Sequence, residues 1–327
     1  MWKKNCYRNG CWDYFKLDER ITSIVIMKID LKELIVEFNN NLKLDYDLKK
    51  KNWFNIGGKT KAFYKADNLK ELIKFLKKIQ DKEKIFVLGA GSNTLISDNK
   101  FDGVVIKLSK NFNNISLHSE DIIVAGSAVT DKSLSEFAME NNLGGFEFLS
   151  CIPGTVGGGI KMNAGCFQRE FKDILISIQA LNKSGQVIAI PAKDINFKYR
   201  DSGLSEDFIF LSASFKGFKK DKNIIINEIR LLKEKKEQAQ PTKIKTSGST
   251  FKNPIGQSDK KVWQLIKESV PLEKTFGDAS ISEKHCNFFV NKGNAKFKDM
   301  KKLINFVSES VFKKTGVKLE TEIKILE

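Results

Sequence analysis

The sequence predicts a mixed α+β protein built in several layers, and three observations predict this class. Short apolar runs alternate with amphipathic segments along most of the chain. The 327 residues are enough for two or three small domains. Apolar residues make up 41% and charged residues 29%, which is typical of a soluble globular protein, and no apolar run approaches the length of a membrane span.

The expected helices follow from apolar spacing and end signals. Asp30 caps the first helix, and Asn68 caps the segment LKELIKFLKKI. Asp131 begins a third helix, and Pro241 ends a charged one. Helices are therefore expected at residues 31–38, 69–79, 132–142, 225–238, 262–269 and in a long segment ending near Lys314.

The expected strands are short apolar runs bounded by turn residues. They lie at residues 85–89, 104–108, 122–126, 174–181, 186–190 and 208–215, and the alternating residues 317–327 predict a last one. Residues 1–26 show no periodicity, and Met27 precedes the first helical segment. We expect residues 1–27 to be a disordered extension or upstream sequence from a wrong start.

The formal net charge of +16 admits two interpretations. The lysines are spread along the chain in amphipathic patterns such as KELIKFLKKIQDKEK, without an arginine-rich arm or a ribonucleoprotein-type aromatic motif. This pattern favours solvated lysine faces over a nucleic-acid partner. A nucleotide-binding or RNA-binding module remains the alternative.

The cysteines argue against disulfides and zinc. Five of them are scattered along the chain without a CxxC pair, so we expect no metal site. Charges interrupt the first thirty residues before a signal-peptide core can form, so we expect a cytoplasmic protein. Cys151 and Cys166 are expected to be small buried fillers rather than redox groups.

Three glycine turns follow or precede strands: NIGGK (55–59), LGAGSNTL (88–95) and IPGTVGGGIKMNAG (152–165). The second lacks the third glycine of a dinucleotide fingerprint, because Thr94 stands there, and the third lacks the Walker A pattern. Any one of them is more often an ordinary tight turn. Together, with Ser92, Asn93 and Asn163 beside them, they favour a long diphosphate ligand lying across strand ends.

The segment SGSTFKNP (247–254) places a glycine between two serines and a lysine, an asparagine and a proline behind them. We expect none of it to be buried in a core. Taken alone it is a plain Ser-Gly loop, because no His or Asp lies nearby in sequence to activate Ser249.

The order of longer motifs carries a resemblance. The chain contains NWFNIGG, VLGAGSNTLISD, GFEFLSCIPGTVGGGIKMNAG, FKYRDS, SGSTFKNP, GDASISEKHCNFFVN and LETEIKIL. From about residue 28 to the C-terminus it resembles the UDP-N-acetylenolpyruvoylglucosamine reductases, the MurB flavoenzymes of peptidoglycan synthesis. The resemblance implies roles in cell wall biogenesis, cell shape and cell division.

The resemblance implies an FAD-binding fold of the vanillyl-alcohol oxidase type in two subdomains, followed by an α+β substrate-binding domain. The expected boundaries are 28–102 and 103–230 for the FAD-binding subdomains, 231–315 for the substrate domain and 316–327 for a terminal strand. It also implies FAD as cofactor, NADPH as co-substrate and UDP-N-acetylglucosamine enolpyruvate as substrate. Neither histidine, His118 or His285, follows a glycine pair, so we expect the FAD to be non-covalent. We further expect a monomer without nucleic-acid or membrane partners.

The resemblance implies three catalytic residues. Ser249 would donate the proton, Arg200 would stabilise the developing charge, and Glu322 would orient or protonate the intermediate. Implied substrate contacts are Tyr199, Lys252, Asn253 and His285. Implied cofactor contacts are Asn55, Ile56, Gly57, Gly58, Gly89, Ala90, Gly91, Ser92, Asn93, Thr94, Pro153, Gly154, Thr155, Gly158, Asn163, Ala164 and Gly165.

The chain departs from the family pattern at a few points. Trp53 stands where threonine is more frequent, and Thr321 where proline is common. No tyrosine lies between Arg200 and Pro241, so the chain is similar to the shorter subtype without a tyrosine loop. Without the resemblance, Arg200 would be taken for a surface ion pair and Glu322 for an outward-facing strand residue. A flavin oxidase of the same fold is the rival enzyme.

Overall fold

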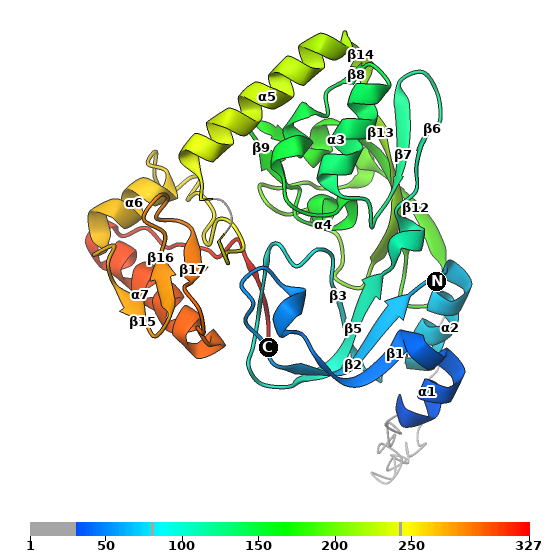
Figure 1. Ribbon diagram of the computed structural model, residues 1–327, viewed down its shortest axis with the longest axis horizontal. Helices are drawn as coiled ribbons and strands as arrows, with labels where there is room; N and C mark the ends of the chain where they lie inside the picture. The colour runs from blue at the N-terminus through cyan, green and yellow to red at the C-terminus, as the bar shows by residue number, and fades with distance from the viewer. Residues whose placement is uncertain (1–30, 80–81, 242–243) are drawn as a thin grey trace, which may run out of the picture.

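Three sheets of three or more strands organise the residues described by this computed structural model, which are 31–79, 82–241 and 244–327. Figure 1 shows them as a blue and cyan part near the N-terminus, a green part, and an orange and red C-terminal part. The long helix α5 (Lys222–Ala239) runs from the green part toward the C-terminal part. The extension predicted for residues 1–27 lies outside the described residues.

The first sheet has the order β1-β2-β5-β3, in which β1 and β2 are antiparallel and the other pairs parallel. Helices α1 and α2 pack their apolar faces on it, with Leu72, Phe75 and Leu76 of α2 fully or nearly fully buried. Asn68 caps α2 by accepting a bond of 2.9 Å from Glu71 N. Its elements are α1 (Leu31–Phe38), β1 (Leu42–Asp47), β2 (Lys59–Ala66), α2 (Leu69–Ile79), β3 (Lys84–Val87) and β5 (Phe101–Leu108).

The second sheet is antiparallel, with the order β12-β11-β13-β7-β6. One buried cluster unites this sheet with the short helices that carry the third glycine turn, so the turn is held on a rigid base. Its elements are β6 (Ile115–Leu117), β7 (Ile122–Gly126), α3 (Asp131–Glu140), β8 (Leu143–Gly144), η4 (Glu147–Cys151), α4 (Val156–Lys161), β9 (Gly165–Cys166), β10 (Arg169–Glu170), β11 (Leu175–Leu181), β12 (Val187–Pro191), β13 (Ile209–Lys216) and β14 (Phe218–Lys219).

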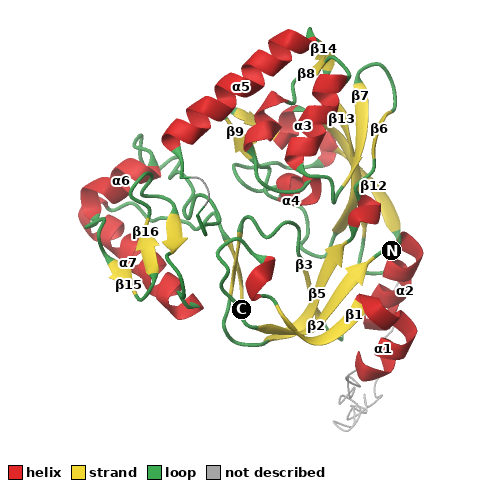
Figure 2. Cartoon of the chain, in the orientation of Figure 1, coloured by secondary structure: helices red, strands yellow, loops and turns green. Residues whose placement is uncertain are grey.

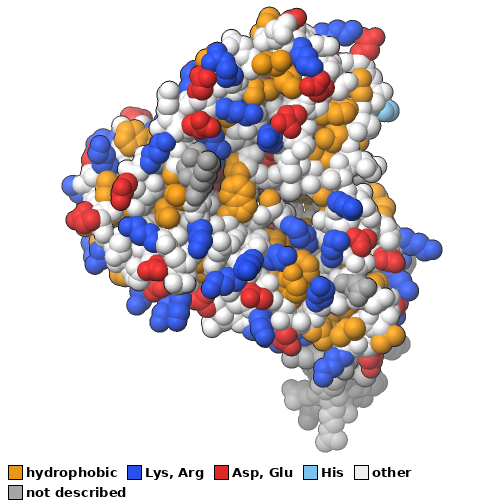
Figure 3. Space-filling model, viewed as in Figure 1, with side chains coloured by type: hydrophobic (Ala, Val, Ile, Leu, Met, Phe, Trp, Pro, Cys, Tyr) orange, Lys and Arg blue, Asp and Glu red, His pale blue; other side chains and the backbone are white. Residues whose placement is uncertain are grey.

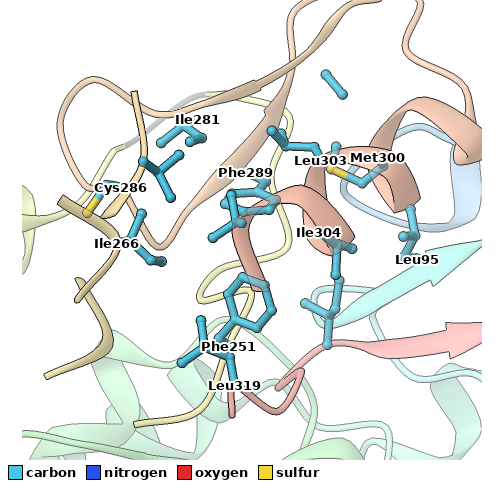
Figure 4. Close-up of a cluster of buried hydrophobic side chains, with 14 of the residues drawn as sticks. Leu95, Phe251, Ile266, Ile281, Cys286, Phe289, Met300, Leu303, Ile304 and Leu319 are labelled. Carbon is cyan, nitrogen blue, oxygen red and sulfur yellow. The ribbon is translucent and has the colours of Figure 1, made fainter. Parts of the chain in front are cut away.

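The C-terminal part packs two helices against a small antiparallel sheet (Figure 2). Figure 4 shows its core, in which Phe251 and Phe289 meet Ile304 and Leu319, and Leu95 from the N-terminal part reaches the side of α7. Its elements are α6 (Val262–Ser269), β15 (Thr275–Phe276), β16 (Ala279–Ile281), β17 (Phe289–Asn291) and α7 (Phe297–Thr315).

The chain end returns to the N-terminal part. Strand β18 (Lys324–Leu326) pairs in parallel with β4 (Thr94–Ile96), which directly follows the second glycine turn. The C-terminus therefore lies beside the blue and cyan part in Figure 1, although it belongs to the last residues of the sequence. This pairing brings Glu322 to the glycine turn.

The structure confirms the α+β class and the expected helices. It corrects two details. The terminal strand covers only Lys324–Leu326 rather than residues 317–327, because Thr321 forms a separate bridge with Phe251. The segment SGSTFKNP is not excluded from the core: Ser247, Thr250 and Phe251 are buried there.

The predicted boundary after residue 102 lies inside β5, since that whole strand pairs within the first sheet. The first core also includes residues from the second sheet, Leu181 and Ile209. The division into domains at residues 28–102, 103–230, 231–315 and 316–327 therefore stays a prediction.

Candidate active site

A cavity of about 790 Å³ lies where the three parts of the molecule meet. Its wall is formed by the second and third glycine turns, by Ser247–Ser249, and by Arg200 and Glu322. In Figure 3 the surface is hollowed between these parts, and lysine and arginine side chains gather along its lower border. The volume falls within the range of cofactor and small-molecule sites.

The second glycine turn connects β3 to β4 and is held by backbone contacts. Gly91 has φ +70°, and a Cβ there would lie 2.2 Å from the Lys51 carbonyl oxygen, so no other residue fits. The Lys107 ammonium donates to the Gly89 carbonyl. Burial, followed by the nearby Lys51 charge, lowers the pKa of Lys107.

The third glycine turn leads into α4. A Cβ on Gly159 would lie 2.2 Å from the Phe171 ring, so this position must stay bare for the turn to pack on the core. Asn163 is fully buried with φ +41°, and its amide donates to Glu170 at 3.0 Å and to the Lys198 carbonyl at 3.1 Å. Asn163 thus fixes the end of the turn rather than lining the cavity.

Some buried polar atoms of the cavity wall have no partner within the described residues. They are the Ser127 hydroxyl, both carboxyl oxygens of Asp131 and the Thr246 hydroxyl. Burial raises the pKa of Asp131 well above its ordinary value. Unsatisfied buried groups are rare in folded proteins, and the position of these atoms in the cavity wall makes them candidates for contact with a ligand.

Glu322 joins three motifs that are far apart in the sequence. Its backbone N–H donates to the Thr250 carbonyl at 2.8 Å, next to Ser249. Its carbonyl accepts a bond of 3.0 Å from Asn93, and its carboxylate accepts one of 3.0 Å from Arg200 Nε. Burial raises the pKa of Glu322, although the Arg200 charge opposes the shift.

Arg200 is held from several sides. It has φ +58°, an uncommon conformation for a residue with a side chain. Nη2 donates to the Gly165 carbonyl at 3.0 Å, Nη1 lies 3.5 Å from a Glu170 oxygen, and the guanidinium carbon lies 4.8 Å from the centre of the Tyr199 ring. The fork is thereby fixed at the edge of the cavity.

Ser249 lines the cavity and forms an isolated bridge with Phe288. Its hydroxyl makes no hydrogen bond to any described residue. The neighbouring chain is clamped by Asn287, whose carbonyl accepts from Thr250 at 2.7 Å and whose amide exchanges bonds of 3.0 and 2.9 Å with the backbone of Phe251. A free hydroxyl is thus presented on a rigid turn.

Most of the expected cofactor contacts line this cavity. Those that do are Gly89, Ala90, Gly91, Ser92, Asn93, Thr94, Pro153, Gly154, Thr155, Gly158, Ala164 and Gly165. The residues Asn55–Gly58 do not line it: Ile56 is buried in the C-terminal core, and Gly58 N donates to the Ser97 carbonyl at 2.7 Å. Cofactor contact by Asn55, Ile56, Gly57, Gly58 and Asn163 stays a prediction.

A smaller cavity of about 270 Å³ adjoins the first and is lined by Lys252, Arg200 and Glu322. The other expected substrate residues line neither cavity. Asn253 donates to the Tyr199 hydroxyl at 3.2 Å. His285 accepts from Asn287 N at 3.3 Å and packs edge-on against Phe288, and burial lowers its pKa.

The two cysteines of the third glycine turn are not both core fillers. Cys151 is buried as expected, but Cys166 is only half-buried, and both line the large cavity. The neighbouring Cys166 thiol, and to a lesser extent Ser150 and Lys236, lowers the pKa of Cys151, although burial opposes the shift. The Cys151 sulfur raises the pKa of Cys166.

Sequence reasoning missed several residues of the cavity wall and its support. Lys236 is not one of them: the sequence offers Lys233, Lys235 and Lys236 as candidates for a contact with the UDP diphosphate but does not choose among them. In the structure Lys236 lines the cavity and donates to the Cys151 carbonyl at 2.6 Å. Asp131 read only as a helix start, and Ser127 as a turn residue. Asn287 carried no signal beyond its place in a longer motif.

Comparisons with known proteins identify the family. The model of the UDP-N-acetylenolpyruvoylglucosamine reductase C-terminal domain matches residues 240–326, and that of an FAD binding domain matches residues 60–190. The UDP-N-acetylenolpyruvoylglucosamine reductase of Pelagibacter ubique is 67% identical over 297 residues, covering 91% of this chain and 98% of its own length. That of Rickettsia typhi is 44% identical, covering 86% and 94%.

A solved structure is similar throughout. The UDP-N-acetylenolpyruvylglucosamine reductase (MurB) of Thermus caldophilus has a TM-score of 0.75 and 29% identity, covering 88% of this chain and 98% of its own. The described residues fit FAD, since the cavity combines glycine turns that admit a diphosphate, several lysines, and buried polar atoms without partners. The chain therefore has the FAD-binding fold of the vanillyl-alcohol oxidase type and is an FAD-dependent oxidoreductase. It belongs to the UDP-N-acetylenolpyruvoylglucosamine reductase family.

Proposed function

We propose that the protein reduces UDP-N-acetylglucosamine enolpyruvate to UDP-N-acetylmuramate in peptidoglycan synthesis, with NADPH as the hydride source. One observation carries this proposal: Glu322 connects the second glycine turn, the Ser249 segment and Arg200 through three hydrogen bonds. A diphosphate cradle, a fixed guanidinium and a free serine hydroxyl thus meet at one cavity. The family name of the similar proteins supports the same substrate.

The substrate is a vinyl ether that bears a carboxylate, and its reduction adds a hydride to the terminal carbon and a proton to the carbon beside the carboxylate. FAD, held by the second and third glycine turns that line the large cavity, would supply the hydride chemistry between NADPH and the terminal carbon. Arg200 suits the negative charge that then develops, because its guanidinium binds a carboxylate through a planar fork. Its contacts with Gly165 and Glu322 hold it in place beforehand.

Ser249 donates the proton in this proposal. A serine hydroxyl is a weak acid, so it protonates only a strongly basic carbon and needs cationic neighbours to stabilise the alkoxide. Lys252, adjoining the small cavity, and Arg200 supply positive charge on this side. The hydroxyl is uncommitted within the described residues, which leaves its proton available.

Glu322 positions Arg200 and has a second role open to it. Burial raises the pKa of its carboxyl, and this favours the protonated form more than in an exposed glutamate. It can therefore share a proton with the reacting carbon or with Ser249 through solvent in the small cavity. This role is compatible with the Arg200 contact, since the guanidinium occupies only one of the two carboxyl oxygens.

The charged wall suggests where the UDP diphosphate lies. Lys236 reaches the large cavity from α5, on the side of Cys151 and Cys166, and we assign it to that diphosphate. NADPH and the substrate need the same face of the cofactor, so one pocket serves them in turn. We expect parallel initial-rate plots; intersecting plots would count against the shared pocket.

The expected monomeric state stays a prediction. The test of function is a visible absorption series on the purified holoenzyme without oxygen. NADPH should bleach the flavin bands, and added UDP-N-acetylglucosamine enolpyruvate should restore them. Bands that only oxygen restores would favour a flavin oxidase, and unbleached bands would exclude NADPH as donor.

A further inference from the structure

Asp131 is the most unusual buried residue of the cavity. It begins α3, its side chain is fully buried, and neither carboxyl oxygen has a hydrogen-bond partner in the described residues. The third glycine turn lies directly against it: a Cβ on Gly154 would be 2.9 Å from Asp131 Oδ2 and 3.6 Å from the Ser92 hydroxyl. The carboxyl thus sits between the two turns that form the cavity wall.

Within the described residues, no cationic side chain forms an ion pair with Asp131. The elements packed against α3 carry Glu147, which pairs with Lys220, and the cavity-facing Cys151 and Lys236. Burial is the cause that raises the pKa of Asp131, and none of these groups opposes it. A buried carboxylate without a cation is costly, so the neutral acid is the stable form.

A neutral carboxylic acid has a proton to donate, which an ionised carboxylate lacks. Ser127, at the end of β7, is a second unsatisfied donor in the same wall. Its carbonyl accepts from Gly157 N at 3.0 Å, so its position relative to the third glycine turn is fixed. Two donors without acceptors, next to two glycine turns, match the oxygens of a diphosphate or of its attached sugar chain.

We propose that the Asp131 carboxyl and the Ser127 hydroxyl donate hydrogen bonds to acceptor oxygens of the bound FAD. Asp131 is thereby a binding residue for the cofactor rather than only a helix start. This inference depends on FAD binding alone and not on the proposed substrate, so a wrong substrate would leave it intact.

The experiment measures the dissociation constant of FAD on apo-protein by flavin fluorescence. Asp131→Asn keeps an N–H donor and should bind FAD within about threefold of the wild type, whereas Asp131→Ala should bind about 10- to 100-fold more weakly. Equal affinity of Asp131→Ala and the wild type would overturn the proposal.

Two serines provide a matched test of whether a buried hydroxyl affects FAD binding only when it lines the cavity. Ser127 and Ser135 are both buried hydroxyls without partners, but only Ser127 lines the cavity. Ser127→Ala should weaken FAD binding about three- to tenfold, and Ser135→Ala should leave it unchanged. Equal effects of the two substitutions would contradict a direct contact of Ser127.

The pH dependence distinguishes a donor from an ionised acceptor. As pH rises, Asp131 ionises and loses its proton, so wild-type affinity for FAD should fall relative to that of Asp131→Asn. A wild-type affinity that rises with pH relative to this variant would overturn the proposal. This comparison holds even if Asp131→Ala does not fold.

The stability of apo-protein gives a readout without FAD. A carboxyl whose pKa is raised by folding stabilises the fold fully only below its unfolded value, and this contribution is lost as pH rises through the folded value. Asp131→Asn should therefore melt at a higher temperature than the wild type at neutral pH, and the difference should shrink in acid. A lower melting temperature at neutral pH would show that Asp131 is ionised and paired.

Discussion

The two ends of the large cavity differ in how their ionisable side chains are satisfied. At the Ser249 end, the Arg200 guanidinium donates hydrogen bonds to the Glu322 carboxylate and to the Gly165 carbonyl, and the Glu322 carbonyl accepts one from Asn93. At the glycine-turn end, the Asp131 carboxyl oxygens have no hydrogen-bond partner within the described residues, and neither does the neighbouring Ser127 hydroxyl. The first arrangement fixes geometry before a ligand arrives, and the second is completed by one.

We interpret this difference as a division between residues that serve catalysis and residues that bind the cofactor. Side chains that stabilise a transition state act best when their orientation is fixed in advance, as protein hydrogen bonds fix Arg200. Groups that retain a cofactor contribute most when their only partners are on that cofactor, because its loss leaves them unsatisfied. Substitutions at the two ends should therefore affect different measurements.

The largest effect is expected for Ser249→Ala. Loss of the proton donor should slow the substrate-dependent return of the flavin bands by about 10²- to 10⁴-fold, while bleaching by NADPH is retained. Stopped-flow absorbance measures the two half-reactions separately. Ser258→Ala, a change of the same kind outside both cavities, is the control. A slowed bleaching step of equal size would show that Ser249 is not specific to proton transfer.

Arg200→Lys should have the next largest effect. The ammonium keeps the charge but loses the fork that contacts Glu322 and Gly165, so kcat/KM for the enolpyruvyl substrate should fall about 10²-fold. The dissociation constant of FAD should stay near the wild-type value. A change in FAD affinity as large as that in kcat/KM would erase the distinction between the two ends.

Asn287→Ala tests the clamp beneath Ser249. The substitution leaves the backbone N–H and carbonyl of buried Phe251 without partners, so the free energy of unfolding should fall by about 2 kcal/mol. Asn294→Ala, which removes an exposed amide nearby, is the matched control for denaturant unfolding. Equal unfolding midpoints for the two variants would contradict the clamp.

The smallest effect concerns Cys151. Because the pKa of Cys151 is lowered, its thiolate forms at a lower pH than that of an ordinary cysteine, so alkylation of apo-protein by iodoacetamide should level off before about pH 9. Cys166→Ala removes the hydrogen bond that lowers this pKa and should slow alkylation at pH 7 about tenfold. Peptide mass spectrometry follows the site, and FAD should protect it. Alkylation that keeps rising to pH 9 would contradict the lowered pKa.

The sequence predicts elements best where local signals suffice. The Asn68 cap and the amphipathic spacing that follows it predict α2. The start of α5 was predicted less accurately, because it depends on Asp221, whose side chain accepts from the backbone N–H groups of Asn223 and Ile224. The short β4 was not predicted, because its pairing with β18 joins residues more than two hundred positions apart. Such pairing leaves no periodic signal.

The site shows the same limit. The glycine turns and the SGS segment stand out because their residue types serve backbone geometry, whereas Asp131 looks like any residue at a helix start. Its burial depends on Gly154 and Ser92 approaching from distant turns. The polar neighbours of Phe251 likewise predicted an exposed segment, yet Asn287 satisfies their backbone and lets the ring pack inward.

None of the described helices is long and apolar enough to cross a membrane.

The most direct test of the account is a crystal structure of the Ser249→Ala holoenzyme with FAD and UDP-N-acetylglucosamine enolpyruvate bound. The account predicts the substrate carboxylate on Arg200, the carbon beside it facing the methyl group introduced by the substitution, and an FAD oxygen within hydrogen-bond distance of Asp131. An enolpyruvyl group bound away from Arg200 and from the substituted position would contradict the central claim that hydride and proton addition occur at this one cavity.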